Sequence, residues 1–324
     1  MFAITQKDFG GPETLEWAKV ADPRPEPGEV IIDITATAVN RADLLQRQGN
    51  YPPPPGSTDI LGLECSGTIV SVGAALTMDR IGERVTALLN GGGYAQKVAV
   101  PLGQVMSVPE GVSVLDAGAL PEVACTVWSN LTKVLQLREG STILIHGGGS
   151  GIGTFAIQVA KALGAKIAVT AGSQEKLNVC ASLGADLLIN YKEQDFVEVI
   201  RETWGGAENI LDNMGASYLS KNVEALKRNG HLAIIGMQGG TKVDFQIDQL
   251  LRKNATISAT SLRGRPESEK SKICHEVEKF VWPWITDGTV KQVIDRVMPI
   301  EQAGEAHKIL EAGEATGKIV LQVR

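Results

Sequence analysis

A glycine cluster that follows a short apolar run is the part of this sequence whose residue types most clearly indicate chemistry. The run Thr142-Ile-Leu-Ile-His146 precedes Gly147-Gly-Gly-Ser-Gly-Ile-Gly153. Glycines let a backbone approach a phosphate closely, and the N-terminus of a helix attracts an anion. We therefore predict that a dinucleotide pyrophosphate lies against Gly149, Ser150, Gly151, Ile152 and Gly153. Ser150 breaks the strict G-x-G-x-x-G spacing, so an ordinary tight turn remains an alternative, and the flanking strand and helix favour the nucleotide site.

The end of the next apolar run indicates which dinucleotide is bound. Lys166-Ile-Ala-Val-Thr170 reads as the second strand, and Ala171, Gly172 and Ser173 stand where an NAD site carries a carboxylate for the ribose 2′-hydroxyl. A glycine N–H, a serine hydroxyl and an ammonium suit a 2′-phosphate instead. Gly172, Ser173 and Lys176 supply these groups and predict NADPH. The alternative is a capped helix start with Ser173 as N-cap and Lys176 exposed, and Glu175 is expected to point to solvent.

The glycine cluster and residues 171–176 need a β-sheet to position them, and the sequence pattern of residues 123–264 predicts such a sheet. Strand-like and helix-like stretches alternate there, which predicts a complete doubly wound parallel sheet. Its six strands are expected at residues 142–146, 166–170, 186–190, 209–212, 230–236 and 255–259. The helix after the glycine cluster should end at Gly164, where a left-handed glycine stops a helix.

The flanking segments predict a second domain. Residues 1–122 contain short strands with frequent turns, the clearest at 29–35, 67–72, 84–89 and 94–100, and indicate a small distorted β-barrel. Residues 267–287 should form one helix kinked by Pro283. The strand 318–323 should pair back into the barrel. The predicted domains are therefore 1–122 with 265–324, and an inserted 123–264, with the cofactor in the cleft between them.

Composition limits the class of protein. The 324 residues are 43% hydrophobic and 21% charged, with a net charge of −6, so neither nucleic acid nor an anionic membrane is an expected partner. No apolar run approaches the roughly 20 residues of a membrane span. The four cysteines are scattered without a C-x-x-C pair, which fits a reducing compartment, and we predict a cytoplasmic protein.

A metal site is not predicted. Zn²⁺ needs about four cysteine, histidine or carboxylate ligands. Cys274 and His275 are adjacent, and neighbouring side chains on a helix point apart. His146 is expected to be packed or hydrogen-bonded near the glycine cluster. Without a Lewis acid, alcohol oxidation is disfavoured, because nothing stabilises the alkoxide.

Several further motifs resemble a known family along nearly the whole chain. They are Asn40-Arg-Ala-Asp43, Gly49-Asn-Tyr51, Gly62-Leu-Glu-Cys-Ser-Gly67, Gly91-Gly-Gly-Tyr94, Glu305-Ala-His307 and Gly317-Lys-Ile-Val320. The chain resembles the zinc-free, zeta-crystallin-like quinone oxidoreductases among the medium-chain dehydrogenases/reductases, and most closely the branch induced by a tumour suppressor in animals. This resemblance implies a GroES-like barrel with an inserted Rossmann domain. Zinc-dependent relatives carry cysteine where Asn40 stands, histidine where Leu63 stands, and a four-cysteine lobe that is missing here.

The resemblance also implies hydride transfer from the nicotinamide to a quinone or another conjugated carbonyl. Negative charge then develops on the acceptor oxygen and needs a hydrogen-bond donor. Tyr51 and Asn40 are the candidates, with Tyr51 or water delivering the proton. Tyr51 could equally pack on its own proline turn, and Asn40 could hydrogen-bond a turn. Asp43 is better explained as a helix-capping residue than as a catalyst.

Other residues are assigned to the cofactor through the resemblance. The family pattern places these beside the nicotinamide: Thr126, Gly236, Met237, Gln238, Gly239, Leu262 and Arg263. Arg263 could contact a phosphate or pair with an acid. Tyr191, after the third strand, could stack near the adenine, bond the 2′-phosphate, or pack on the surface.

The sequence leaves two alternative functions open, and the resemblance also implies an oligomeric state. An NADPH-dependent enone or alkenal double-bond reductase would use the same site, and a non-catalytic NADPH-binding protein would keep only the cofactor. A homodimer is expected from the resemblance, with the strand 255–259 pairing with its copy.

Overall fold

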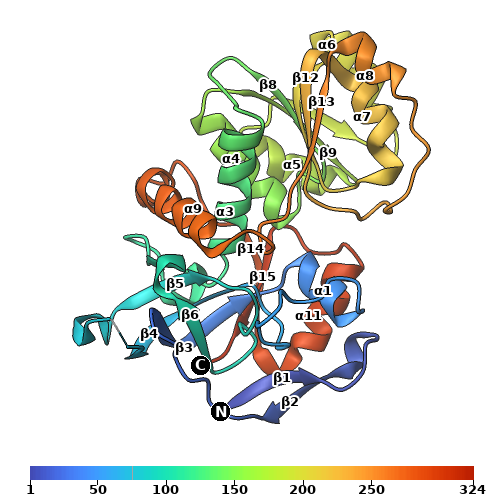
Figure 1. Ribbon diagram of the computed structural model, residues 1–324. Coiled ribbons are helices and arrows are strands. Elements are labelled where there is room, and N and C mark those ends of the chain that lie inside the picture. The colour runs from blue at the N-terminus through green and yellow to red at the C-terminus, as the bar shows by residue number, and fades with distance from the viewer. Residues whose placement is uncertain (75) are drawn as a thin grey trace. The chain divides into compact units, whose positions relative to one another are not determined.

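The computed structural model describes residues 1–74 and 76–324, which form two compact units (Figure 1). The first unit comprises Met1–Cys125, Leu262–Gly288 and Gln292–Arg324, and the second Thr126–Ser261 with Thr289–Lys291. The inserted segment thus runs from Thr126 to Ser261, three residues inside each of the predicted boundaries.

The second unit is built on one parallel sheet of six strands in the order β10-β9-β8-β11-β12-β13. The prediction of a doubly wound sheet is confirmed. Its strands are β8 (Thr142–Ile145), β9 (Lys166–Ala171), β10 (Leu187–Asn190), β11 (Ala207–Asp212), β12 (Leu226–Ile234) and β13 (Thr256–Ala259). The strand order turns back between β8 and β11, and in such sheets ligands bind beyond the carboxyl ends of the strands at this point.

Helices cover both faces of this sheet (Figure 1). The helices α6 (Phe196–Trp204) and α7 (Leu219–Ala225) share one apolar core with Leu144 and Ile210, while Ile143 and Ile145 point to the opposite face and are also buried. Figure 1 shows α4 (Gly151–Ala162) and α5 (Gln174–Ser182) together, apart from α6, α7 and α8 (Asp248–Lys253). Burial on both faces explains why the strands read as continuous apolar runs.

The first unit contains a seven-stranded, mostly antiparallel sheet with the order β14-β15-β3-β4-β5-β7, and β6 also pairs with β3. Apolar side chains from five of these strands share one core, so the sheet wraps around it as a barrel does. The strands are β3 (Glu29–Ala38), β4 (Glu64–Val72), β5 (Arg84–Leu88), β6 (Lys97–Pro101), β7 (Val105–Ser107), β14 (Ile294–Pro299) and β15 (Lys318–Gln322); β1 (Phe2–Gln6) and β2 (Leu15–Lys19) form a separate hairpin.

The terminal strand pairs back into the barrel as predicted, because β15 runs antiparallel to β3. A second core lies between the barrel and α11 (Ala303–Glu311). The remaining helices of this unit are α1 (Arg41–Arg47), α2 (Val114–Ala117), α9 (Glu267–Phe280) and α10 (Trp282–Thr286), and α3 (Pro121–Trp128) continues from it into the second unit.

Two predicted elements were wrong in detail. The single kinked helix 267–287 is two helices, because Pro283 occupies the first turn of α10, where its missing N–H costs nothing. The strand predicted at 94–100 begins only at Lys97. Tyr94 instead accepts a hydrogen bond from the Ile4 N–H at 2.8 Å, and Ala95 forms a bridge with Ala3. Among the described residues, no helix is long and apolar enough to cross a membrane.

Candidate active site

The glycine loop of the second unit has the local structure that phosphate binding requires. Gly147 follows β8 with a φ of +67°, and α4 begins at Gly151 with Ser150 as its N-cap. Ser150 Oγ accepts a hydrogen bond from the Gly153 N–H at 3.0 Å. A Cβ on Gly153 would lie 2.3 Å from the Gly147 carbonyl oxygen, so only glycine fits there. The predicted helix end is confirmed, because Gly164 has a φ of +79° directly after the C-cap Leu163.

A buried histidine anchors the start of this loop, as the sequence predicted. His146 Nδ1 lies 3.0 Å from Thr170 Oγ1, which accepts from the Gly147 N–H at 3.3 Å, and His146 Nε2 lies 2.7 Å from Asn222 Oδ1. Burial lowers the pKa of His146 to about 4, so the ring is neutral. Because Asn222 Oδ1 can only accept, Nε2 carries the proton and the Thr170 hydroxyl donates to Nδ1. The residue directly after β8 is thereby tied to β9 and α7.

The residues predicted to bind a 2′-phosphate meet at the carboxyl end of β9. A Cβ on Gly172 would lie 2.5 Å from Tyr191 Oη, and a Cβ on Gly149 would lie 3.0 Å from the side chain of Lys176. Ser173 is the N-cap of α5, and its Oγ accepts from the Lys176 N–H at 3.4 Å. Ser173 therefore caps the helix, as the alternative interpretation predicted, and its role toward a 2′-phosphate stays a prediction.

Glu175 is the acidic residue at this place, and its carboxylate engages the Ser173 hydroxyl. It is exposed, and hydrogen bonds from its own backbone N–H and from the Ser173 hydroxyl lower the pKa of its carboxyl. Tyr191 is 47% exposed, so its ring is open to solvent on one side while its hydroxyl lies against Gly172. A glycine loop, a hydroxyl, an ammonium and a phenol are thus gathered within one unit.

The loops after β11 and β12 complete the same edge of the sheet. The Gly239 N–H donates to the Met214 carbonyl at 2.7 Å, and the Gln238 N–H donates to the Asn213 carbonyl at 3.2 Å. A Cβ on Gly239 would collide with the Ser217 side chain, and Met237 is 50% exposed. The predicted Gly236–Gly239 segment therefore lies beyond the carboxyl end of β12, where parallel sheets bind ligands.

Sequence reasoning missed Asp212, the last residue of β11. Its carboxylate accepts from the N–H groups of Met214 at 2.8 Å and Gly215 at 2.9 Å, and burial raises its pKa to about 6. An acidic residue at the end of an apolar strand was the signal in the sequence that could have identified Asp212.

Thr126, assigned to the nicotinamide, lies in α3, where its carbonyl accepts from the side chain of Asn130 at 2.9 Å.

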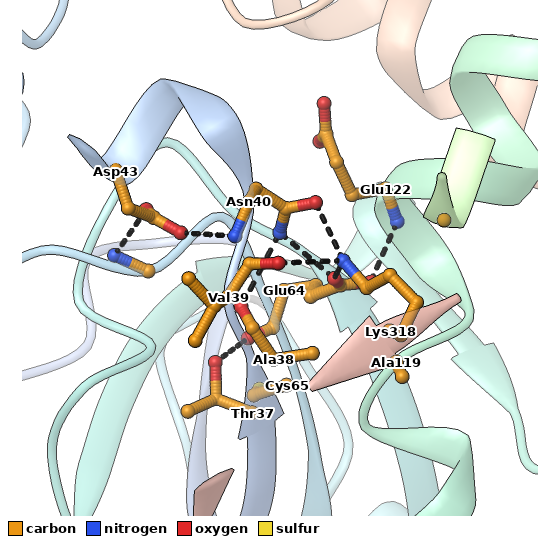
Figure 2. A network of polar contacts seen from close by, with 12 residues as sticks. Thr37, Ala38, Val39, Asn40, Asp43, Glu64, Cys65, Ala119, Glu122 and Lys318 are labelled. Atoms are coloured by element: carbon orange, nitrogen blue, oxygen red, sulfur yellow. Dashed lines mark hydrogen bonds and ion pairs between the residues drawn. The ribbon is translucent and has the colours of Figure 1, made fainter. Parts of the chain in front are cut away.

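In the first unit, Asn40 lies in a buried charged network (Figure 2). Lys318 Nζ donates to Asn40 Oδ1 at 2.6 Å, to Glu64 Oε1 at 2.7 Å and to the Val39 carbonyl at 3.2 Å. Asn40 Nδ2 donates to Glu64 Oε1 at 2.8 Å and to the Ala38 carbonyl at 3.3 Å. Both hydrogens of the Asn40 amide thus have acceptors, and donation to a substrate would require one of them to be released. The catalytic role of Asn40 stays a prediction.

The charged pair in this network is almost completely excluded from water. The side chains of Lys318 and Glu64 are 4% and 0% exposed, and Glu64 Oε2 accepts from the Glu122 N–H at 2.9 Å. Sequence reasoning gave neither residue a role. The signal was a charged residue inside each of two apolar strands, where burial of an unpaired charge is too costly to tolerate.

Asp43 acts as the capping residue that the sequence predicted. Its carboxylate accepts from the Asn40 N–H at 2.8 Å and from the Gly62 N–H at 3.1 Å. Burial raises its pKa to about 6, and the backbone donors and the charges of Lys318 and Arg263 reduce that shift. The start of α1 is thereby fixed to the residues before β4.

A second buried chain of polar groups leads away from Asp43. Arg47 Nη1 lies 3.3 Å from His307 Nδ1, and His307 Nε2 lies 3.1 Å from Tyr94 Oη, which donates to Asp43 at 3.4 Å. Because a guanidinium can only donate, Nδ1 is the acceptor and Nε2 carries the proton. Burial, with the charge of Arg47, lowers the pKa of His307 to about 3, so the ring is neutral.

Tyr51, the other catalytic candidate, is half-buried after α1 and stands against a guanidinium. The Arg263 Cζ atom lies 5.5 Å from the centroid of the Tyr51 ring, and Arg263 Nη1 donates to the Tyr51 carbonyl at 3.5 Å. Arg263 Nε donates to the Asn90 carbonyl at 2.7 Å, and Lys270 Nζ donates to Asn90 Oδ1 at 2.5 Å. Burial lowers the pKa of both cations. Leu262, before Arg263, is buried.

Within residues 1–74 and 76–324, no group of three or more histidine, cysteine or acidic side chains could hold a metal ion. Leu63 is buried at 2% exposure. The four cysteines are free and buried, and the sulfurs of Cys125 and Cys274 lie 3.8 Å apart. The absence of a metal site stays a prediction.

Comparison with known proteins agrees with this geometry. Residues 26–134 match the family described as alcohol dehydrogenase GroES-like domain, and residues 151–279 match the zinc-binding dehydrogenase family. Quinone oxidoreductase of Sus scrofa is 28% identical over 99% of this chain and 97% of its own, and 2-haloacrylate reductase of a Burkholderia species is 29% identical over 99% and 98%. The structure of Escherichia coli quinone oxidoreductase complexed with NADPH superposes with a TM-score of 0.91, 27% identity and full coverage of both chains.

A GroES-like barrel joined to a doubly wound sheet with a glycine loop defines an oxidoreductase of the medium-chain dehydrogenase/reductase class. The chain belongs to this family, and quinone oxidoreductases are among its full-length relatives. The narrower resemblance to the tumour-suppressor-induced branch stays a prediction.

Proposed function

We propose that this protein is an NADPH-dependent reductase of quinones. The observation that carries the proposal is the meeting of Gly172, Ser173, Lys176 and Tyr191 at the end of β9, where the exposed Glu175 carboxylate is engaged by the Ser173 hydroxyl and its own backbone N–H. The quinone oxidoreductase names of full-length relatives, and the NADPH complex of one of them, support it.

The residues of the second unit fit a dinucleotide. Gly153 leaves no space for a side chain, Gly147 has a φ of +67°, and the start of α4 offers backbone N–H groups and the positive dipole end to a pyrophosphate. Lys176 would take the 2′-phosphate through a charge-assisted hydrogen bond, and the Ser173 hydroxyl would join it by exchanging its bond to Glu175. Thr126, Met237, Gln238, Gly239 and Leu262 are proposed to border the nicotinamide. The bound cofactor would supply the hydride, and the protein supplies its orientation.

The residues of the first unit would handle the substrate oxygen. We assign the Tyr51 hydroxyl to hydrogen-bond the acceptor oxygen, where negative charge develops during reduction. Asn40 is hydrogen-bonded to Lys318 and Glu64, and we assign it to the wall of the same substrate site. No metal ion is assigned to this reaction.

The test measures binding and turnover separately. Dissociation constants for NADPH and NADH are measured by fluorescence, and oxidation of NADPH is followed on a panel of quinones, enones, alkenals and haloacrylates. Tighter binding of NADPH and turnover of quinones above all other acceptors support the proposal. Preference for NADH contradicts the cofactor assignment. Saturable NADPH binding with no turnover on the whole panel would favour a non-catalytic NADPH-binding protein.

A second candidate is reduction of a conjugated double bond, such as that of an enone or alkenal. The full-length similarity to a 2-haloacrylate reductase favours it, because such a substrate is an activated alkene. The same panel separates the two candidates by the acceptor with the highest kcat/KM.

We also propose that the protein is a homodimer located in the cytoplasm. The strand β13 ends the six-stranded sheet and could pair with its copy, and Ile247 and Leu251 beside it in sequence are 68% and 73% exposed. Replacing both with lysine should convert a dimer to a monomer in light scattering without unfolding it. A wild-type protein that is monomeric at all concentrations contradicts the assembly. Four free cysteines support a reducing compartment.

A further inference from the structure

We propose that Arg263 is a positioning residue for Tyr51, and that it holds the phenol in place instead of binding the cofactor. The inference rests on the proposed role of Tyr51 in reduction. Its basis is the set of contacts within the first unit: the guanidinium lies 5.5 Å from the Tyr51 ring centroid and bonds the carbonyl oxygens of Tyr51 and Asn90.

The guanidinium joins segments that are far apart in the sequence. Tyr51 lies in the turn after α1, Asn90 lies after β5, and Arg263 precedes α9. Asn90 is itself fixed, because Lys270 Nζ donates to its side-chain oxygen. A planar fork with several fixed donors can bond two carbonyls while its face covers a ring, and a lysine cannot do this. Arg263 therefore ties the Tyr51 turn to Asn90 and, through it, to α9.

The burial of this guanidinium and the bonds of two of its nitrogens limit what else it can bind. Nε and Nη1 donate to backbone carbonyls, Nη2 is buried without a hydrogen-bond partner among the described residues, and the residue is 4% exposed. A cation within about 6 Å of an aromatic face is attracted by the ring, and the attraction is stronger when the cation is desolvated. Two of its three nitrogens are thus engaged at the Tyr51 turn and Asn90, and loss of its charge and fork should release that turn.

The experiment compares Arg263→Gln and Arg263→Lys with Arg265→Gln. Arg265 is a matched control two residues further on, which pairs with Glu269 at 3.6 Å. Hydrogen exchange in peptides that cover residues 49–56 reports on the Tyr51 turn without any substrate. Steady-state kcat on a quinone and the dissociation constant of NADPH report on catalysis and on cofactor binding.

We expect faster exchange across 49–56 in Arg263→Gln, an intermediate rate in Arg263→Lys, and the wild-type rate in Arg265→Gln. A misplaced phenol should lower kcat about tenfold, while the dissociation constant of NADPH stays within about twofold. In a Tyr51→Phe background, Arg263→Gln should lower kcat by less than about twofold, because the group that it positions is gone. Arg263→Lys keeps the buried charge and serves as the test if the glutamine variant does not fold.

Two results would overturn the inference. Weaker NADPH binding with unchanged exchange at 49–56 would make Arg263 a cofactor ligand. If Arg263→Gln and Tyr51→Phe lower kcat independently of each other, Arg263 does not act through Tyr51. If the wild-type protein reduces no quinone, the proposed function fails, and the exchange data still decide whether Arg263 holds the Tyr51 turn.

Discussion

Removal of the Lys176 ammonium should change the choice between NADPH and NADH. Its side chain lies against Gly149 of the glycine loop, and Gly172 and Tyr191 border the same place. A hydrogen bond to a charged group contributes about 1.5–3 kcal/mol, and solvent at this half-exposed side chain places the expected loss near the lower end. Lys176→Ala should therefore weaken NADPH binding roughly tenfold, since about 1.4 kcal/mol corresponds to one factor of ten.

The assay is the dissociation constant of each cofactor, measured by fluorescence at low and high salt. NADH has no 2′-phosphate, so its affinity should change by less than about twofold, and added salt should shrink the NADPH effect. Lys161→Ala is the matched control, because Lys161 lies in the same unit and pairs only loosely with Asp186, at 3.6 Å. Ser173→Asn keeps an N-cap and tests the hydroxyl without loss of helix stability.

Equal weakening of NADH and NADPH by Lys176→Ala would refute the reasoning. It would mean that the ammonium contacts a part common to both cofactors, such as the pyrophosphate. An unchanged affinity for both cofactors would leave Lys176 as a surface residue and remove the main support for NADPH specificity.

Three further predictions concern the first unit. Lys318→Met leaves the Glu64 carboxylate buried and should lower the free energy of unfolding by about 3–5 kcal/mol; chemical denaturation should show partial recovery in the Glu64→Gln double variant, and no recovery would argue against an unpaired charge as the cause. Tyr51→Phe should lower kcat on a quinone about tenfold or more with unchanged NADPH binding; full turnover removes Tyr51 from the mechanism. The folded-state pKa of Asp43 is raised from 3.8 to about 6, so its stabilising contribution is present below pH 4 and is lost as the pH rises through 6. Asp43→Asn should gain stability relative to wild type over this window in urea unfolding, and a constant difference would contradict the shift.

The sequence predicted the parts of the site that depend on neighbours along the chain. A glycine loop, the helix after it and the Ser173 cap are local, because each requires particular backbone angles and donors within a few residues. Alternation of apolar runs predicted the parallel sheet, and parallel strands place all their carboxyl ends at one edge. The positions of Gly172 and Lys176 at that edge were therefore predicted from spacing, and their contact with a cofactor stays a prediction.

The local sequence pattern was insufficient where the same residues are compatible with two different local structures. Pro283 fits a kink within one helix or the first turn of a new one, and the structure has the second. Tyr94 and Ala95 have strand character, and pairing with residues of the N-terminal hairpin decided their place. The secondary structure at such positions depends on pairing with residues distant in sequence, which a short stretch of sequence does not contain.

The sequence by itself determined the fold class, the nucleotide loop and the type of cofactor to test. Only the tertiary structure decided what surrounds the two catalytic candidates. Lys318 reaches Asn40 from 278 residues further along the chain, and Arg263 reaches Tyr51 from 212. Buried charges must find partners because water is excluded, but which partner is available depends on how strands and loops distant in sequence pack together.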